Sequence, residues 1–247
     1  MRKTLAVLLM FLALPAFAGS DDSAKYNELY KNEDYQGAYE GYASMLKKDR
    51  NNPDVWYNAG NALYRLNRAG DAIYAYVKAF TLNPRDSDIR FNLEFAMRQT
   101  GQNFVPDGTP KSLYYLFYYL SDGELRAAAA VFFWLAVLFG SLYFFIGGTA
   151  CRYAVKTAVV SASLCVFSLV WFGARYHSQF SGNVGVVTEK AGVRIYSGPG
   201  DNFKDCASAP EGMIVKIMND SDGDYYEIGL QKDGVSGWAL KTGVQKI

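Results

Sequence analysis

The segment "YSGPGDNF", residues 196–203, has the composition of a phosphate-binding loop: two glycines flank a proline, and an acid follows. Backbone N–H groups in such loops can hold an anion. A phosphate loop, however, needs a helix directly behind it, whose first N–H groups face the anion. The following "DNFKDCASAP" is broken by Pro210 and has no Lys-Ser/Thr pair. We therefore expect a loop that follows a strand, and no nucleotide site.

Other residues that could carry chemistry are sparse. The single histidine, His177, has no cysteine or serine elbow beside it, and no paired carboxylates stand in a cleft-forming segment. The three cysteines form no CxxC motif, which argues against zinc and redox sites. We expect Cys206 to be either a buried lone thiol, the favoured alternative, or an intermolecular one. The sequence predicts no catalytic residue, no metal, no cofactor and no enzymatic activity.

Composition indicates a folded chain with no global electrostatic preference. The 247 residues are 50% hydrophobic and 16% aromatic, which excludes a disordered chain. A formal net charge of +1 gives no field to recruit nucleic acid, so we expect none as a partner. The near-zero mean hydropathy of −0.06 averages over charged segments and two very apolar ones.

The first residues resemble an export signal. Arg2 and Lys3 precede an apolar run, residues 5–14, and the sequence Ala16-Phe17-Ala18 fits a cleavage site. We expect a cleaved signal peptide over residues 1–18, the alternative being an uncleaved N-terminal anchor.

The first third of the chain carries an internal repeat. Small and large residues alternate on two helical faces between Pro53 and Pro84: Trp56, Ala59, Gly60 and Leu63 on the first, Ala72, Tyr76 and Ala79 on the second. About thirty-four residues earlier, Ala38 and Tyr42 repeat the second face. This pattern resembles the tetratricopeptide repeat (TPR), which implies a helical solenoid over residues 19–104 with a capping helix after Pro84.

TPR resemblance implies a groove that binds a peptide or a partner helix. Repeat geometry assigns seven residues to this partner-binding groove: Asn27, Tyr30, Tyr57, Asn61, Tyr64, Phe91 and Phe95. Each could instead be plain helix surface or packing between helices. A clamp for C-terminal carboxylates is not expected, because Ser23, Asp88 and Asn92 occupy its cationic positions.

Two uncharged segments are long enough to cross a bilayer. We expect transmembrane helices at 126–147 and 157–174, joined by a cytoplasmic loop at 148–156. Arg152 and Lys156 in that loop place it in the cytoplasm, and both flanks outside. Before the first span, residues 105–125 form a linker with an interfacial aromatic helix that contains Tyr114, Tyr115, Phe117, Tyr118 and Tyr119.

After a linker at 175–182, residues 183–247 have the alternating hydrophobic pattern that is typical of short β-strands. Their expected core is Val184, Val186, Ile195, Val215, Ile217, Ile228, Trp238 and Leu240. The order "GVVTE", "SGPG", "EGMIVKIM" and "DGVSGWAL" resembles a bacterial SH3 domain, which implies a small all-β SH3-like barrel. Surface aromatics that could line a peptide or glycan groove are Tyr196, Phe203, Tyr225 and Tyr226, of which half could belong to the core.

The predicted fold class is therefore multidomain: a TPR solenoid, a two-helix transmembrane hairpin and an SH3-like barrel. This order resembles BatE-type members of the Bat aerotolerance-operon family. The resemblance implies an inner-membrane scaffold with both soluble domains in the periplasm. It also implies partners among Bat membrane proteins with von Willebrand A domains and a MoxR-type ATPase, in oxygen or envelope-stress tolerance. The alternative is a peptidoglycan-binding anchor that acts through the C-terminal domain.

Overall fold

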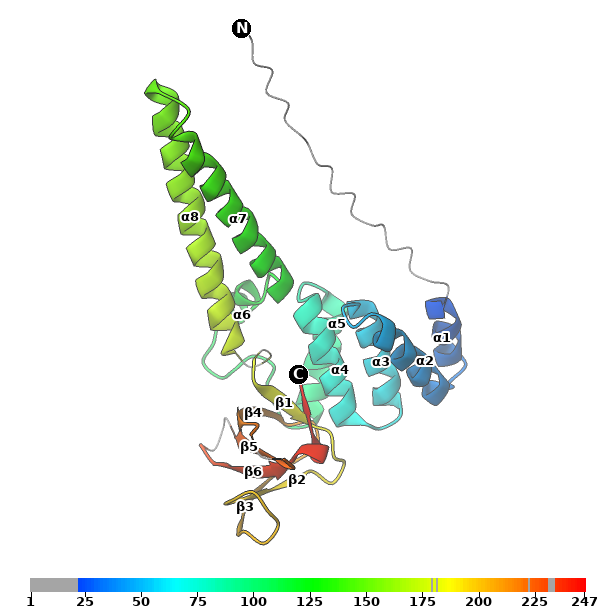
Figure 1. Cartoon of the computed structure of the whole chain (residues 1–247). Helices are drawn as coiled ribbons and strands as arrows, with labels where there is room; N and C mark the ends of the chain where they lie inside the picture. The colour runs from blue at the N-terminus through cyan, green and yellow to red at the C-terminus, as the bar shows by residue number, and fades with distance from the viewer. Residues whose placement is uncertain (1–21, 179, 181, 222, 231–233) are drawn as a thin grey trace.

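The computed structural model describes residues 22–178, 180, 182–221, 223–230 and 234–247. The expected signal peptide lies outside these residues. Along the described chain, a stack of helices is followed by a long helical hairpin and then by a β-sheet, and the hairpin projects away from the other two parts (Figure 1).

Five helices form the stack: α1 (Asp22–Lys31), α2 (Tyr35–Lys48), α3 (Pro53–Arg65), α4 (Ala69–Leu82) and α5 (Ser87–Gln99). Local signals set their starts. The Asn52 side chain accepts hydrogen bonds from the backbone N–H groups of Asp54 and Val55, and Pro53 occupies the first helical position. Helices α1/α2 and α3/α4 form two helical pairs, and α5 packs on α4 as an unpaired last helix.

In both pairs the two helices approach each other closely, but the glycine that allows this lies on the first helix of one pair and on the second helix of the other. In the second pair, Gly60 of α3 is small, and a Cβ there would lie 2.6 Å from the Tyr76 ring. In the first pair, Tyr26 stands at the position that corresponds to Gly60, and Gly41 of α2 makes room for its ring. This exchange of large and small residues explains why the repeat signal is weak in α1.

Of the five aromatic residues expected at a lipid boundary, the short helix α6 (Lys111–Phe117) and the turn after it bury two, whereas Tyr119 is 56% exposed. Tyr114 and Tyr118 lie four residues apart, on one helical face, and are 6% and 2% exposed. Leu113 and Leu116 are 58% and 57% exposed on the other side. The most exposed apolar side chains of α6 are therefore leucines.

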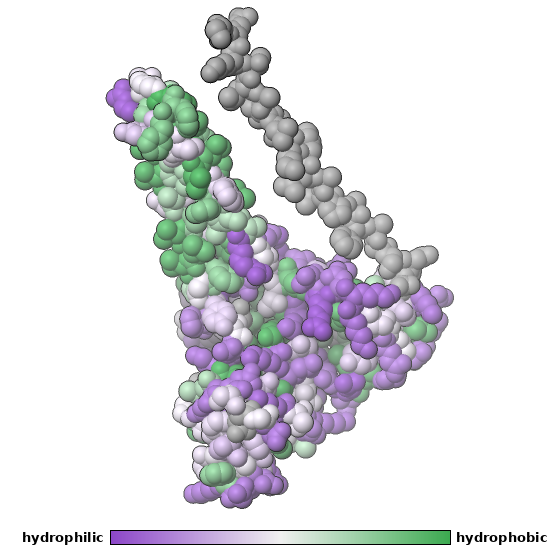
Figure 2. Space-filling view, in the orientation of Figure 1, coloured by the Kyte–Doolittle hydropathy of each residue, from purple (hydrophilic) through white to green (hydrophobic). Residues whose placement is uncertain are grey.

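Two long apolar helices, α7 (Asp122–Leu142) and α8 (Gly148–Tyr176), form the hairpin. Each is long and apolar enough to cross a membrane, and only 11% of its most hydrophobic 18-residue window is buried. Figure 2 shows the hydrophobic surface along the hairpin. The expected cytoplasmic loop at 148–156 is instead the start of α8, since no residue there interrupts a helix once Gly148 has begun it.

Small residues form the seam between α7 and α8. Ala154, Ser161 and Ser168 are buried at seven-residue intervals along α8, and Arg175 continues the series. On α7, Leu125 and Ala129 are buried. Small side chains allow apolar helices to approach closely without large ridges.

Seven strands form one antiparallel sheet in the order β3-β2-β6-β5-β4-β1-β7. They are β1 (Val184–Val187), β2 (Val193–Tyr196), β3 (Asp205–Ala209), β4 (Ile214–Asn219), β5 (Tyr225–Gly229), β6 (Ser236–Leu240) and β7 (Val244–Lys246), with a 3₁₀ turn, η1 (Lys241–Gly243), before β7. The expected barrel is wrong in one respect: the sheet is not closed, because β3 pairs with β2 and β7 pairs with β1, which leaves two edges.

The register of β6 also differs from expectation. Gly237 and Ala239 are buried, whereas Trp238 is half-buried and Leu240 is 42% exposed. Sequence reasoning placed the two large residues inside, but this part of the sheet has room only for the small ones: a Cβ on Gly237 would lie 2.5 Å from the backbone oxygen of Tyr196.

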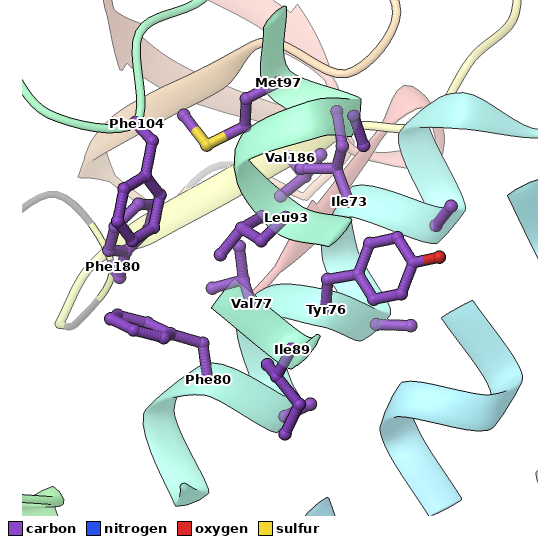
Figure 3. Packing of buried hydrophobic residues seen from close by; sticks show 14 of the residues in the cluster. Ile73, Tyr76, Val77, Phe80, Ile89, Leu93, Met97, Phe104, Phe180 and Val186 are labelled. Carbon is purple, nitrogen blue, oxygen red and sulfur yellow. The ribbon is translucent and has the colours of Figure 1, made fainter. Parts of the chain in front are cut away.

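The helical stack and the sheet share one hydrophobic core. Val186 of β1 and Ile214 of β4 are buried together with Ile73 of α4 and with Leu93 and Met97 of α5 (Figure 3). The same core contains a group of aromatic side chains that joins α4 and α6 to the segment before β1. Their ring centroids lie 4.8–5.7 Å apart, and the residues are Phe80, Phe104, Tyr114, Tyr118 and Phe180.

Polar contacts close the same junction. The Gln102 side chain donates to the backbone oxygen of Gly212 at 2.6 Å and accepts from the backbone N–H of Ile214 at 2.9 Å. At the start of α4, the Glu211 carboxylate accepts from the N–H of Gly70 at 2.8 Å. Gly70 must be small because a Cβ there would lie 2.4 Å from the backbone oxygen of Val187. The two parts are therefore built as one unit.

Candidate functional site

Two adjoining pockets on α1, α3 and α5, of about 250 and 230 Å³, form a continuous depression that we call the TPR groove. They share Tyr30 and Asn61. The lining residues are Asn27, Tyr30, Lys31, Tyr42, Asn58 and Asn61 in the first, and Tyr30, Asn61, Tyr64, Arg65, Tyr76, Phe91, Asn92 and Phe95 in the second. Six of the seven predicted groove residues are among them.

Tyr57 is the exception, and its hydroxyl serves the helix packing. It accepts a hydrogen bond from Asn92 Nδ2 at 3.1 Å, and its ring lies 6.1 Å from that of Tyr76. Tyr57 therefore supports the site from the side and does not line either pocket.

Two of the predicted binding residues, Asn27 and Asn61, are held in a repeated polar arrangement that we call the asparagine clasp. Asn61 Oδ1 accepts from the Tyr76 hydroxyl and from Asn92 Nδ2, both at 2.8 Å. One repeat earlier, Asn27 Oδ1 accepts from the Tyr42 hydroxyl at 2.7 Å and from Asn58 Nδ2 at 3.4 Å. Each clasp ties a first helix to its own second helix and to the first helix of the next repeat.

Sequence reasoning missed this role, although the signal is present. Asn27, Tyr42 and Asn58 each recur 34 positions later, as Asn61, Tyr76 and Asn92. A polar residue that recurs with the repeat period fits a position that every repeat needs for packing, and so a structural role.

Burial fixes the protonation of the clasp tyrosines. It raises the pKa of Tyr42 to about 12, and it raises the pKa of Tyr76 further. Both hydroxyls donate to the asparagine oxygens, and burial keeps them protonated to a higher pH than an exposed tyrosine. This defined orientation leaves the floor of the TPR groove rigid.

Exposed aromatic rings stand on that floor. Phe91 and Phe95 of α5 are 63% and 38% exposed, and their rings stack at 6.5 Å. Tyr64 of α3 meets Phe95 edge-on at 5.9 Å. Large exposed aromatics over a rigid base are typical anchors for a protein partner, because they bury much area and lose little conformational entropy.

Two cations flank the groove and were not predicted. Lys31 and Arg65 end α1 and α3, 34 positions apart, and each lines one pocket. The Arg65 guanidinium lies 4.4 Å from the Tyr35 ring centroid. The groove thus offers aromatic contact at one end and positive charge along its side.

On the sheet, the four predicted surface aromatics do not form one surface. Tyr196 lies opposite Trp238, and Tyr225 lies opposite Leu240. Trp238 and Leu240 both belong to β6, where they point away from the core. Tyr226 instead packs against the core of the sheet. Phe203, 45% exposed, folds over Gly198 within the "SGPG" loop, which joins β2 to β3 and has a strand behind it.

Comparison with protein-family models matches residues 53–86 to the tetratricopeptide repeat family, the segment that contains α3 and α4. Comparison with curated proteins gives no match. The family match and the helical pairs together support a protein–protein interaction scaffold, since TPR stacks present such surfaces. Within the described residues, no three His, Cys, Asp or Glu side chains gather as metal ligands would.

Proposed function

We propose that this protein is a membrane-anchored scaffold, without enzymatic activity, that captures protein partners in its TPR groove. The observation that carries the proposal is the pair of exposed phenylalanines, Phe91 and Phe95, on a floor fixed by the asparagine clasps. An exposed apolar surface of this kind on a rigid helical repeat is unfavourable in water, and its burial by a partner lowers the free energy.

The hairpin supplies the anchor in this proposal. Helices of soluble cores bury most of their surface, whereas α7 and α8 expose large side chains such as Trp134, Phe167 and Val170, at 67%, 58% and 65%. Lipid is the environment that makes such exposure favourable. Arg152 and Lys156 near the turn favour a cytoplasmic turn, with the helical stack and the sheet outside.

The order of TPR stack, hairpin and β-domain supports a finer proposal. In this proposal the protein works in the bacterial envelope with other Bat membrane proteins carrying von Willebrand A domains and with a MoxR-type ATPase, in tolerance of oxygen or envelope stress. This assignment rests on the resemblance of the sequence to BatE-type proteins. The C-terminal sheet would be a second contact surface for the same assembly.

A second candidate function is peptidoglycan binding through the C-terminal sheet. It is favoured by Tyr196 and Trp238, which are half-buried and lie opposite each other on β2 and β6. Flat aromatic side chains suit sugar rings as well as peptides. Binding of the full chain to purified cell wall tests it: Trp238→Ala should abolish binding if this function is the main one.

Affinity capture from gently solubilised membranes tests the scaffold. The triple variant Tyr64→Ala/Phe91→Ala/Phe95→Ala removes the exposed rings and leaves both clasps intact, so it should lose the membrane partners that the natural protein retains. The control Met218→Ala truncates a side chain that is 58% exposed on the sheet and should retain them. Unchanged partners in the triple variant would refute capture by the TPR groove.

A further inference from the structure

A second groove lies on the other side of the helical stack, between α2 and α4. It has a volume of about 490 Å³, and α3 forms its floor with Trp56, Ala59 and Leu63. Its walls include Tyr39 and Lys47 of α2 and Tyr74 and Lys78 of α4, and Arg50, which follows α2, also lines it. We call it the outer groove. It shares no lining residue with the TPR groove.

The outer groove concentrates positive charge. Lys47, Arg50 and Lys78 all line it, and within the described residues none of the three has a carboxylate at ion-pair distance. Asp71 is the acid among the lining residues, but its carboxylate already pairs with Arg68, whose Nε and terminal nitrogen both lie 2.8 Å from Oδ2. The three cations therefore face the cavity without compensation.

The pKa of Lys78 reflects the same excess of positive charge. Its pKa is lowered first by burial and then by the positive charge of Arg50. An anion in the cavity would relieve both effects, because an opposite charge nearby favours the charged amine. Lys78 Nζ also lies 5.5 Å from the centroid of the Tyr74 ring, which holds it against the wall of the groove.

Aromatic side chains give the groove a flat apolar wall. The rings of Trp56 and Tyr74 meet edge-on at 5.8 Å. Trp56 Nε1 donates to the backbone oxygen of Arg50 at 2.8 Å, which fixes the segment that presents that cation. The wall and the cations are thus positioned by the fold before any ligand arrives, which reduces the entropic cost of binding.

We propose that the outer groove binds an acidic peptide segment of a partner protein, in extended form, with carboxylates on Lys47, Arg50 and Lys78 and apolar side chains on Trp56 and Tyr74. A bare phosphate ion would satisfy the cations but would leave the aromatic wall unused. The groove lies between two helices and is lined at β7, an edge strand, by Gln245, so residues of α2, α4 and β7 could contact successive residues of a chain. The proposal depends on residues outside the TPR groove and stands whether or not that groove binds a partner.

Fluorescence anisotropy with the full chain in lipid nanodiscs tests this proposal. The probe is a fluorescein-labelled nine-residue peptide in which glutamate alternates with leucine, and its comparison is the glutamine analogue. We expect the glutamate peptide to bind at least about tenfold more tightly than the analogue, and more weakly as salt rises, as paired charges require. Inorganic phosphate at equal concentration should compete poorly.

Variants locate the binding. Lys47→Gln/Arg50→Gln/Lys78→Met removes the three charges at similar side-chain volume and should weaken the glutamate peptide by about tenfold or more. The matched control, Lys31→Gln/Arg65→Gln, removes the cations of the TPR groove and should leave it unchanged. The proposal is overturned if both peptides bind alike, if the first variant binds as the natural protein does, or if the control loses as much.

Discussion

Arg175 shows how one residue connects the hairpin to the rest of the molecule. Its side chain is fully buried at the end of α8, 3.0 Å from an Asp122 carboxylate oxygen and 2.6 Å from the backbone oxygen of Leu120. Its guanidinium also lies 4.5 Å from the Tyr118 ring centroid. A buried arginine is tolerated where its charge is paired and its terminal nitrogens are met in this way, although Nε has no hydrogen-bond partner among the described residues.

Replacing Arg175 by methionine should destabilise the protein strongly. The change removes the ion pair with Asp122 and the hydrogen bond to the Leu120 carbonyl, at a cost of about 3–5 kcal/mol. Thermal unfolding in detergent measures it. Arg152→Met, at the exposed start of α8, is the control and should have little effect. Equal melting temperatures for Arg175→Met and the natural protein would show that the ion pair contributes nothing.

The clasp tyrosines predict loss of stability in base. Their folded pKa values lie above the ordinary value of 10, at about 12 for Tyr42. The folded state therefore holds these protons more tightly than the unfolded state. Their contribution to stability is complete below pH 10 and is lost as the pH rises from 10 towards 12.

Denaturant unfolding at pH 9, 10 and 11 measures this dependence. We expect the free energy of unfolding to fall across this range, and to fall less in Tyr42→Phe/Tyr76→Phe, which cannot ionise. Tyr119→Phe, at a side chain 56% exposed, is the control and should keep the natural profile. A double variant with the natural profile would show that the clasp tyrosines do not carry the effect.

Among the elements, the contact between α5 and β4 decides whether the stack and the sheet act together. Gln102 follows α5 and bridges to Gly212 and Ile214 with both ends of its side-chain amide. Val186 and Ile214 then sit in a core built mostly by helices. The sheet therefore covers the outer side of α4 and α5, where a further helix would otherwise extend the stack.

Gln102→Ala should loosen this junction. The Gly212 carbonyl and the Ile214 amide lose their hydrogen-bond partner, at a cost of about 1–3 kcal/mol if water does not replace it. Hydrogen exchange at the Ile214 amide, which the Gln102 side chain accepts from, should become faster. Gln99→Ala, at an exposed position one turn earlier, should not change it. Unchanged exchange at Ile214 in Gln102→Ala would mean that the core alone holds the sheet in place.

At the scale of the whole molecule, the proposed topology puts the stack and the sheet on one side of a membrane and the hairpin turn on the other. Two native cysteines report on the two sides: Cys206 is exposed on β3, which contradicts the favoured expectation of a buried thiol, and Cys151 lies at the start of α8 beside the turn. A membrane-impermeant maleimide added to intact spheroplasts should label Cys206. Cys151 should be labelled after permeabilisation. Labelling of Cys151 before permeabilisation would show that the hairpin turn, and not the sheet, lies on the outer side.

The sequence predicts the helical repeat well, because Gly60, Ala72 and Tyr76 are dictated by local helix crossing and recur with a fixed period. Which polar side chains are free to bind a partner is harder to predict, because only the 34-residue recurrence points to a packing role. Asn27 and Asn61 have the composition of binding residues, but their partners lie 15 and 31 positions away and become visible once the helices are packed.

Long-range packing also explains the other differences. Tyr114 and Tyr118 suit a lipid boundary by composition, yet Tyr118 packs against Phe80 and Phe180, which come from distant segments, and Tyr114 packs against Phe104. The open sheet likewise depends on which strands pair, because the alternation of residues within a strand does not determine closure. The expected surface of Tyr196 and Tyr226 is divided for the same reason.

Site-specific photocrosslinking from the TPR groove tests the central claim most directly. A photoreactive phenylalanine analogue replaces Phe91 in living cells, and in a parallel strain it replaces Phe203 on the sheet, where the side chain is also exposed. We predict a crosslinked membrane protein of defined mass from position 91 that disappears when Tyr64→Ala and Phe95→Ala are added. No crosslink from position 91, or one that survives those substitutions, would contradict a scaffold that works through this groove.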